Sequence, residues 1–136
     1  MATWLDRLDY GNRDIGGPID QFWLTGPLRI TPRQQVDLVH RSLSGRLPVS
    51  PAHIELVWRA VEIERTGDAF FRGKTGLGTQ DGHAIGWLVG YVERAGRRHA
   101  YATVMRGANA EEREVERLIP LRKAITRRVL ERAGLL

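Results

Sequence analysis

The residues best suited to chemistry stand together at Lys74-Thr75-Gly76, inside the stretch FFRGKTGLG. Side chains in a strand alternate between two faces, so Lys74 and Gly76 would face one way and Thr75 the other. The lysine then offers a cation to an anionic substrate, and the threonine hydroxyl can donate to a carboxylate. The glycine lets a ligand lie against the backbone and use the next amide, that of Leu77, as a hydrogen-bond donor.

A simpler explanation of the same tripeptide stays open. A lysine at the edge of a sheet is often a hydrated charge that discourages pairing with another chain. Lys74 is nevertheless unusual in this sequence, because arginine supplies all but two of the 21 basic residues. The tripeptide alone does not separate a substrate-facing lysine from a protective one.

Three strands are predicted to hold this motif, all after Gly67, where the hydrophobic period changes from that of a helix. They cover residues 69–76, HAIGWLVGYVER at 83–94 and RRHAYATVMR at 97–106. Arg94-Ala95-Gly96-Arg97 joins the last two strands and is typical of a hairpin. The motif is therefore expected on the first strand of an antiparallel sheet.

Two helices with strong start signals are predicted before the strands. Thr31 and Gln34 form a capping box, with proline at the first helical position, and this helix ends at Gly45. Ser50-Pro51 repeats the device, and the second helix is expected to extend to Thr66-Gly67.

The remaining segments complete the predicted fold. TWLDRLDYGN at 3–12 reads as the end of a helix, and the apolar, turn-rich stretch at 13–30 predicts a packed omega-type loop. EEREVERL is helical, but Pro120 predicts a break at Ile119 and a new helix from Pro120 to about Ala133. Helices segregated from antiparallel strands indicate an α+β fold, in one domain spanning 1–136.

Composition argues against several other functions. Without cysteine there is no disulfide, thiolate metal site or cysteine nucleophile, and the four histidines are scattered, so no metal is expected. About half of the basic residues lie between Arg94 and Arg132, but glutamates among them favour a solvated face over a nucleic-acid site.

The longest apolar run, 84–92, is shorter than the about 20 residues of a membrane span. The opening MATWLDR shows no signal peptide, which predicts a soluble, unexported, hence cytoplasmic chain as written.

Several motifs together give the sequence a family resemblance. In order they are YGN at 10–12, FWLTG at 22–26, GKTG at 73–76, IGWLVGYVE at 85–93 and LIPLRKAI at 118–125. This set resembles the class D (oxacillinase-type) serine β-lactamases, whose third motif is K-T-G. The resemblance implies part of the serine β-lactamase/penicillin-binding fold: three antiparallel strands with a C-terminal helix against the sheet, and an N-terminal region of helices and packed loop.

The resemblance also implies a role for particular residues. Lys74, Thr75 and Gly76 would lie beside the bound β-lactam, and the amide of Leu77 would be one of two oxyanion donors. Arg122 would pair with the β-lactam carboxylate, for which a guanidinium fork is well shaped.

Three residues from the N-terminal region have implied roles as well. Trp23 would donate from its indole N–H to the family's carbamylated lysine, since an indole is a donor only. Tyr10 and Asn12 would stand at the cleft. A core aromatic for Trp23 and a helix-surface charge for Arg122 are the alternatives that the residues alone leave open.

The catalytic nucleophile and base of the family are missing. The chain's serines at 42, 44 and 50 are followed three residues later by Gly45, Leu47 and His53, so no S-x-x-K exists, and S-x-V is absent too. The chain resembles only the C-terminal half of the family domain, and the family's carbon-dioxide-modified lysine lies in the missing part, with no other cofactor implied. A truncated class D β-lactamase, inactive alone, is the expectation; the alternative is a fragment of a β-lactam sensor domain that is acylated without turnover.

The resemblance further implies a β-lactam antibiotic as ligand and a periplasmic location for the family. In the family, N-terminal strands complete the sheet beside the last strand, so the strand from about Arg98 to Met105 is expected to be an open edge. That edge invites pairing with the missing half or self-association. Which β-lactams the parent enzyme prefers is not readable from these residues.

Overall fold

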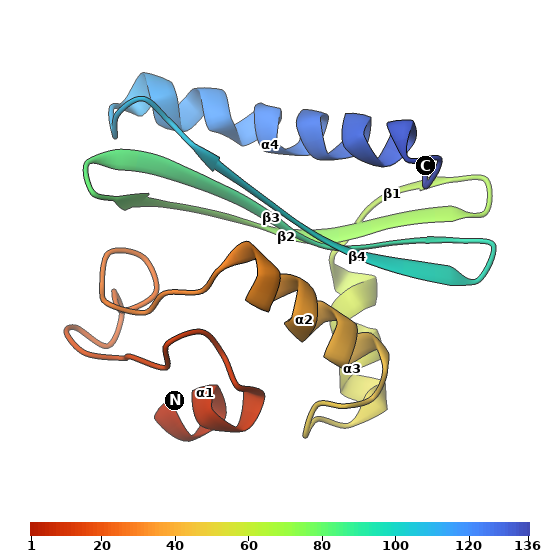
Figure 1. The fold of residues 1–136 in the computed structure, drawn as a ribbon, viewed down its shortest axis with the longest axis horizontal. Helices are drawn as coiled ribbons and strands as arrows, with labels where there is room; N and C mark the ends of the chain where they lie inside the picture. The colour runs from red at the N-terminus through yellow and green to blue at the C-terminus, as the bar shows by residue number, and fades with distance from the viewer.

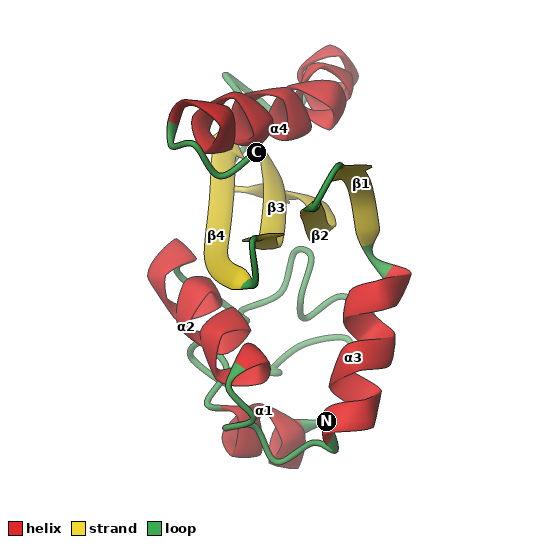
Figure 2. Cartoon of the chain, turned by 90° about the vertical axis from the view of Figure 1, so that its right-hand side faces the viewer, coloured by secondary structure: helices red, strands yellow, loops and turns green.

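The structure is a computed structural model that describes all residues, 1–136. In chain order its elements are α1 (Ala2–Leu8), α2 (Pro32–Leu43), α3 (Pro51–Ala60), β1 (Glu62–Thr66), β2 (Ala69–Gln80), β3 (His83–Arg94), β4 (Arg97–Arg106) and α4 (Glu112–Arg132). The strands form one antiparallel sheet in the order β1-β2-β3-β4. Helix α4 covers one face, and α1, α2 and α3 lie on the other side (Figure 1, Figure 2).

The main core lies between the sheet and α4. Its buried members are Phe71, Leu88, Val92, Tyr101 and Leu130. The Tyr101 hydroxyl donates to the Arg72 carbonyl at 2.9 Å and occupies the space beside Gly73, where an added Cβ would stand 2.3 Å from it. The α+β class and the antiparallel sheet under a C-terminal helix are confirmed.

The two capped helices begin where the sequence predicts. The Thr31 side chain accepts from the Gln34 amide, and the Gln34 side chain accepts from the Thr31 amide at 2.9 Å, so the capping box is complete. Ser50 caps α3 in the same way, by accepting from the His53 amide. Both helices start at a proline. An N–H at the first helical position has no acceptor within the helix, so the proline costs no hydrogen bond there.

The prediction that the second of these helices reaches Thr66-Gly67 is wrong, because α3 ends at Ala60 and a fourth strand, β1, follows. Gly67, at φ +60°, turns the chain so that β1 pairs with the start of β2. Arg72 on β2 binds Glu62, and Arg127 on α4 binds Glu64. These partners are distant in sequence, so a window over 62–66 cannot reveal the strand.

The predicted break at Ile119 is also wrong, since α4 is continuous from Glu112 to Arg132 with Pro120 inside it. Proline removes one intrahelical hydrogen bond, here to the carbonyl of Glu116, and both residues are exposed, so water can satisfy that carbonyl. Leu118 and Arg122 on either side are buried against the sheet and hold both halves of the helix in line.

The apolar loop between α1 and α2 is less packed than predicted. Phe22 is buried, but Ile19 is 72% exposed and Trp23 53%. The strand that carries Lys74 is longer than predicted, since it continues to Gln80. The loop lies on the side of the sheet away from α4, and much of its apolar surface has no partner in this chain.

Candidate functional site

The second half of β2 is a free strand edge. β1 pairs with β2 only from Ala69 to Arg72, whereas β3 pairs with β2 from Phe70 to Gln80. The stretch 74–80 therefore has a neighbouring strand on one side only. The K-T-G motif falls within this stretch, where a ligand can reach the backbone.

The direction of the backbone groups follows from one hydrogen bond. The Gly73 N–H donates to the Val61 carbonyl at 2.9 Å, toward β1. Because strand residues alternate in direction, the N–H and C=O groups of Thr75 and Leu77 point to the same free edge. In keeping with this, the Lys74 ammonium curls over the edge and donates to the Thr75 carbonyl at 2.7 Å. The Leu77 N–H remains available there as a donor.

The side chains of the motif divide between the two faces of the sheet. Gly76 lies opposite Trp87, with 3.4 Å between the site of an added Cβ and the Trp87 Cβ, and Lys74 lies opposite Val89. These residues line a cavity of about 940 Å³ between the sheet, α2, α3 and the loop. Thr75 pairs with Leu88, whose side chain is in the core beneath α4. The Thr75 side chain thus lies on the face of the sheet that α4 covers.

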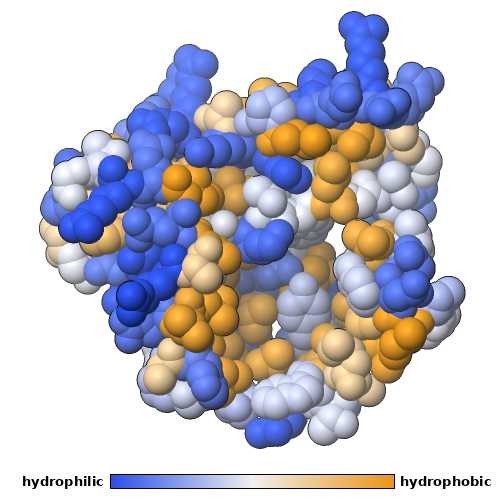
Figure 3. Space-filling view, turned by 180° about the vertical axis from the view of Figure 1, so that it is seen from behind, coloured by the Kyte–Doolittle hydropathy of each residue, from blue (hydrophilic) through white to orange (hydrophobic).

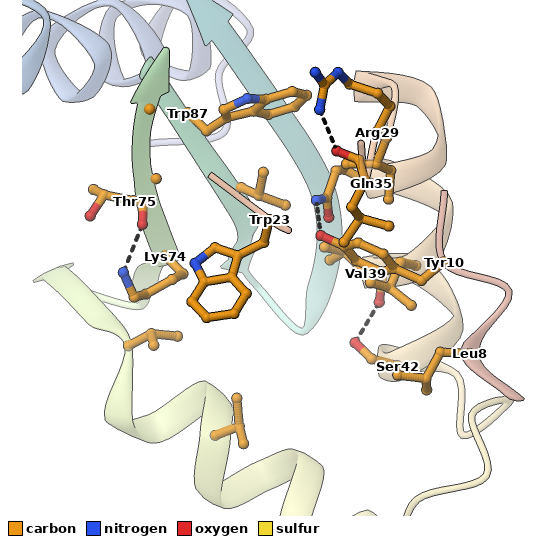
Figure 4. A pocket seen from close by; sticks show the side chains of 18 of the residues that line it. Leu8, Tyr10, Trp23, Arg29, Gln35, Val39, Ser42, Lys74, Thr75 and Trp87 are labelled. Carbon is orange, nitrogen blue, oxygen red and sulfur yellow. Dashed lines mark hydrogen bonds between the residues drawn. The ribbon is translucent and has the colours of Figure 1, made fainter. Parts of the chain in front are cut away.

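Apolar residues dominate the wall of this cavity. Figure 3 shows them gathered around a hollow on the back of the molecule. Several remain well exposed, including Trp23 at 53%, Leu24 at 41% and Val57 at 57%. Trp23 packs edge-on against Phe22, with ring centroids 4.8 Å apart, and its indole ring points toward Lys74 (Figure 4).

The YGN segment is divided between the cavity and the loop. Tyr10 lines the cavity and its hydroxyl accepts from the Gln35 side chain at 2.9 Å. Burial raises the pKa of Tyr10, and the hydrogen bond from Gln35 opposes that shift. Asn12 is not in the cavity wall: its amide group donates to the Pro27 carbonyl and accepts from the Arg29 N–H, each at 2.9 Å. Asn12 thereby fastens the loop that carries Trp23.

Arg122 reaches the motif from the opposite face of the sheet. Its Nη1 donates to the Gly76 carbonyl at 2.7 Å, and its side chain lies beneath β3 at Gly86. The residue is 8% exposed, and Nε is buried without a partner. Burial lowers the pKa of Arg122, and no carboxylate in this chain pairs with it.

The structure adds two residues that sequence reasoning missed. Trp87 stands directly beside Gly76 on the cavity face, and Trp58 donates from its indole to the Ser42 hydroxyl at 3.1 Å in the same wall. Trp87 lies within the recognisable IGWLVGYVE segment, but its place follows only from the β2–β3 register. No group of histidine, aspartate and glutamate residues is arranged to hold a metal ion. None of the helices combines the length and the apolar character that spanning a bilayer requires.

Comparisons with individual known proteins identify relatives of this chain, although no family model matches it. The β-lactamase OXA-48 of Klebsiella pneumoniae is 35% identical over 131 residues, which are 96% of this chain and 47% of that enzyme. OXA-5 of Pseudomonas aeruginosa is 33% identical over 139 residues, covering all of this chain and 50% of that enzyme. The regulatory protein BlaR1 of Bacillus licheniformis is 33% identical over 109 residues, 79% of this chain and 18% of that protein.

Known structures agree. The class D β-lactamase YbXI from Nostoc superposes with a TM-score of 0.85 at 37% identity, covering all of this chain and 55% of that one. FUS-1 (OXA-85) from Fusobacterium nucleatum gives a TM-score of 0.87 at 31% identity, covering 100% and 54%. The chain spans about half the length of these relatives and matches their C-terminal portion. The homologues and structural neighbours of this chain are therefore class D β-lactamases, and the chain matches the C-terminal half of their domain along its whole length.

Proposed function

We propose that this chain supplies the β-lactam-binding wall of a serine β-lactamase site and has no turnover of its own. The observation that carries the proposal is the free edge of β2. There the Leu77 N–H points outward beside the Lys74 ammonium, at the rim of a 940 Å³ cavity. A strand edge with an unpaired donor suits the developing negative charge on an acyl oxygen.

The two faces of β2 suggest how a β-lactam would lie. The amide carbonyl would meet the Leu77 N–H at the edge, with Lys74 on the cavity side. Thr75 and Arg122 share the α4 side, so the carboxylate would be held at that rim. Gly76, without a side chain, lets the ligand approach the backbone. Arg122 fits the role because it is buried, lacks a carboxylate partner and already reaches Gly76.

The remaining residues with roles implied by the resemblance come from the N-terminal region, across the cavity from β2. Trp23 would present its indole N–H to the base of the reaction, which this chain lacks. Tyr10 lines the cleft. Asn12 lies outside its wall, and its bonds to Pro27 and Arg29 support a contribution through the loop that positions Trp23.

The cavity itself supports the idea of a missing half. It is apolar, and its exposed Trp23, Leu24 and Val57 form a surface suited to another protein segment. We propose that the part of the domain bearing the serine and its lysine base fills this space. Without them the chain can hold a β-lactam reversibly but cannot form an acyl-enzyme.

A sensor domain is the second candidate, favoured by the similarity to BlaR1. A lactamase and a sensor differ in whether the acyl-enzyme is hydrolysed. Combining this chain with a separately expressed N-terminal half that carries S-x-x-K distinguishes them. Continuous turnover indicates the lactamase, and a stable acyl-protein indicates the sensor.

The binding proposal is tested on the chain alone. Benzylpenicillin is titrated while amide chemical shifts are followed by NMR. Shifts should centre on Thr75 and Leu77, weaken in Lys74→Ala, and persist in Lys123→Ala, which removes the chain's other lysine, exposed on α4. The purified chain should neither hydrolyse a chromogenic cephalosporin nor become covalently labelled.

Two results would contradict the proposal. One is the absence of any shift along the edge of β2 at saturating penicillin. The other is turnover that survives purification and disappears in Thr75→Ala, which would make this chain an enzyme by itself.

A further inference from the structure

The side chain of Tyr101 reaches across two strands of the sheet. Tyr101 lies on β4 opposite Gly90 of β3, and Gly90 lies opposite Gly73 of β2. Because neither glycine has a side chain, the tyrosine extends across β3 and its hydroxyl ends at Gly73, where an added Cβ would stand 2.3 Å from the oxygen. These three residues form one row across the sheet, and the row ends one residue before Lys74.

The Tyr101 hydroxyl holds one end of a peptide group. It donates to the Arg72 carbonyl at 2.9 Å, and the N–H of the same peptide group, that of Gly73, donates to the Val61 carbonyl at 2.9 Å. The Arg72 carbonyl oxygen stands over Gly90, where an added Cβ would be 2.0 Å from it. The peptide group between Arg72 and Gly73 is thus bound at both ends by residues outside the β2–β3 pair.

The hydroxyl is a buried donor on a well-packed ring. Tyr101 is 9% exposed, and its ring packs against Phe71 with the ring centroids 5.5 Å apart. Burial raises the pKa of Tyr101, so the hydroxyl keeps its proton and remains a donor at neutral pH. The bond to the Arg72 carbonyl therefore comes from a ring of fixed position rather than from a mobile surface side chain.

The peptide group that Tyr101 binds stands where β2 loses its second neighbour. β1 pairs with β2 as far as Arg72, and from Lys74 onward only β3 is paired with it. The Leu77 N–H, to which the β-lactam carbonyl is proposed to bind, lies on this one-sided stretch. Its direction depends on the direction in which the strand leaves Gly73, which the bound peptide group sets.

A second peptide group has the same arrangement four residues later. The Gly76 carbonyl accepts from Arg122 at 2.7 Å, and the N–H of that peptide group, that of Leu77, points to the same edge as the Gly73 N–H. Side-chain donors hold the carbonyl ends of both groups. At Gly73 the Val61 carbonyl takes the place that a ligand carbonyl would take at Leu77. A hydrogen bond to the carbonyl also polarises the N–H of the same group.

We propose that Tyr101 is a positioning residue for β-lactam binding, whose hydroxyl fixes the Arg72–Gly73 peptide group and thereby the direction in which the Leu77 N–H meets the ligand. This role rests on the proposed function, because it concerns the edge to which the ligand binds. Tyr101 does not touch the ligand itself, since it is buried and lies outside the cavity wall. A hydroxyl that served the core alone would add stability and leave the edge unchanged.

Tyr101→Phe keeps the ring and removes only the hydroxyl. In the penicillin NMR titration it should raise the dissociation constant at least about threefold, the order expected for the loss of one hydrogen bond. Tyr91→Phe is the matched control. The buried Tyr91 hydroxyl also bonds Arg72, but it accepts from the side-chain Nη1 at 2.5 Å and not from the peptide group. This control should leave the dissociation constant unchanged.

Hydrogen exchange in the ligand-free chain gives a readout that does not depend on penicillin. In Tyr101→Phe, exchange of the Gly73 N–H should accelerate at least about tenfold more than exchange of the Leu130 N–H. Leu130 is buried on α4 in the same core, so its amide reports opening of the core as a whole. Tyr91→Phe should change the exchange rates of these two amides by the same factor.

A substitution at Gly73 tests the close approach of the hydroxyl. Gly73→Ala places a methyl group where the Tyr101 oxygen stands, so it should lower the folding equilibrium constant at least about tenfold. Tyr101→Phe removes that oxygen. Added to Tyr101→Phe, Gly73→Ala should therefore lower the constant by no more than about threefold, and urea denaturation of the four proteins measures the difference.

The role of Tyr101 is overturned if Tyr101→Phe binds penicillin as tightly as the wild type, or if Tyr91→Phe weakens binding equally. It is also overturned if exchange at Gly73 accelerates only as much as exchange at Leu130. A wild-type chain that shows no penicillin-induced shifts contradicts the proposed function instead, and the exchange comparison then decides alone whether Tyr101 orients this edge.

Discussion

The guanidinium of Arg122 and the carbonyl of Gly76 are joined through the sheet: Nη1 donates to that oxygen at 2.7 Å from the face opposite the cavity. Arg122 is thus tied to the centre of the K-T-G motif although 46 residues separate the two in the chain. Its Nε is buried with no partner. An unsatisfied buried donor costs free energy of folding, which suggests a residue kept for a ligand rather than for stability.

Arg122→Met separates these two roles. Methionine fills similar space without a buried charge, so the free energy of unfolding should be unchanged or up to about 2 kcal/mol higher. Penicillin-induced shifts at Thr75 and Leu77 should disappear. Urea denaturation and the NMR titration are the measurements. A large loss of stability would show that the bond to Gly76 holds the fold.

Two glycines of the sheet should respond differently to alanine. A Cβ at Gly90 would stand 2.0 Å from the Arg72 carbonyl oxygen, whereas a Cβ at Gly76 would be 3.4 Å from its nearest neighbour, on Trp87. Gly90→Ala should therefore lower the free energy of unfolding by about 1–3 kcal/mol or more. Gly76→Ala should leave it nearly unchanged while weakening penicillin binding. Equal stability losses in the two variants would contradict the geometry.

The pair Glu64–Arg127 predicts a dependence of stability on pH. The hydrogen bond from Arg127 is the main cause that lowers the pKa of Glu64 below its ordinary value of 4.5. A depressed carboxyl pKa adds stability above the unfolded-state value, and this is lost as pH falls through the folded-state value. Between pH 6 and pH 3 the wild type should lose more stability than Glu64→Gln, as measured by thermal unfolding. Parallel curves for the two proteins would show that the pair contributes nothing.

Local signals predicted the parts of the fold that depend on local chemistry. The capping box at Thr31 and the cap at Ser50 involve residues within one turn, so the sequence window contains both partners. Strand β1 depends on Arg72 and Arg127, which lie far along the chain, so the local sequence does not predict it. The directions of Lys74 and Thr75 follow from strand alternation alone.

The rest of the site depends on tertiary arrangement. The position of Trp87 beside Gly76 is set by the register of two strands, and the approach of Arg122 by the packing of α4. The role of Asn12 in fastening the loop could not be read from YGN, because its partners Pro27 and Arg29 become neighbours only when the loop closes.

Pro120 tests why the helix α4 stays continuous. If packing of Leu118 and Arg122 holds the helix in line against the preference of proline, removal of the proline should release a local cost. Pro120→Ala restores the missing N–H to Glu116 and should raise the free energy of unfolding by up to about 3 kcal/mol, the difference between proline and alanine in a helix interior. Urea denaturation measures it, and Lys123→Ala, another exposed position of α4, is the control that should change little. A Pro120→Ala variant that is no more stable than the wild type would mean that the freed Glu116 carbonyl is already fully satisfied by water and that the helix bears no strain at this position.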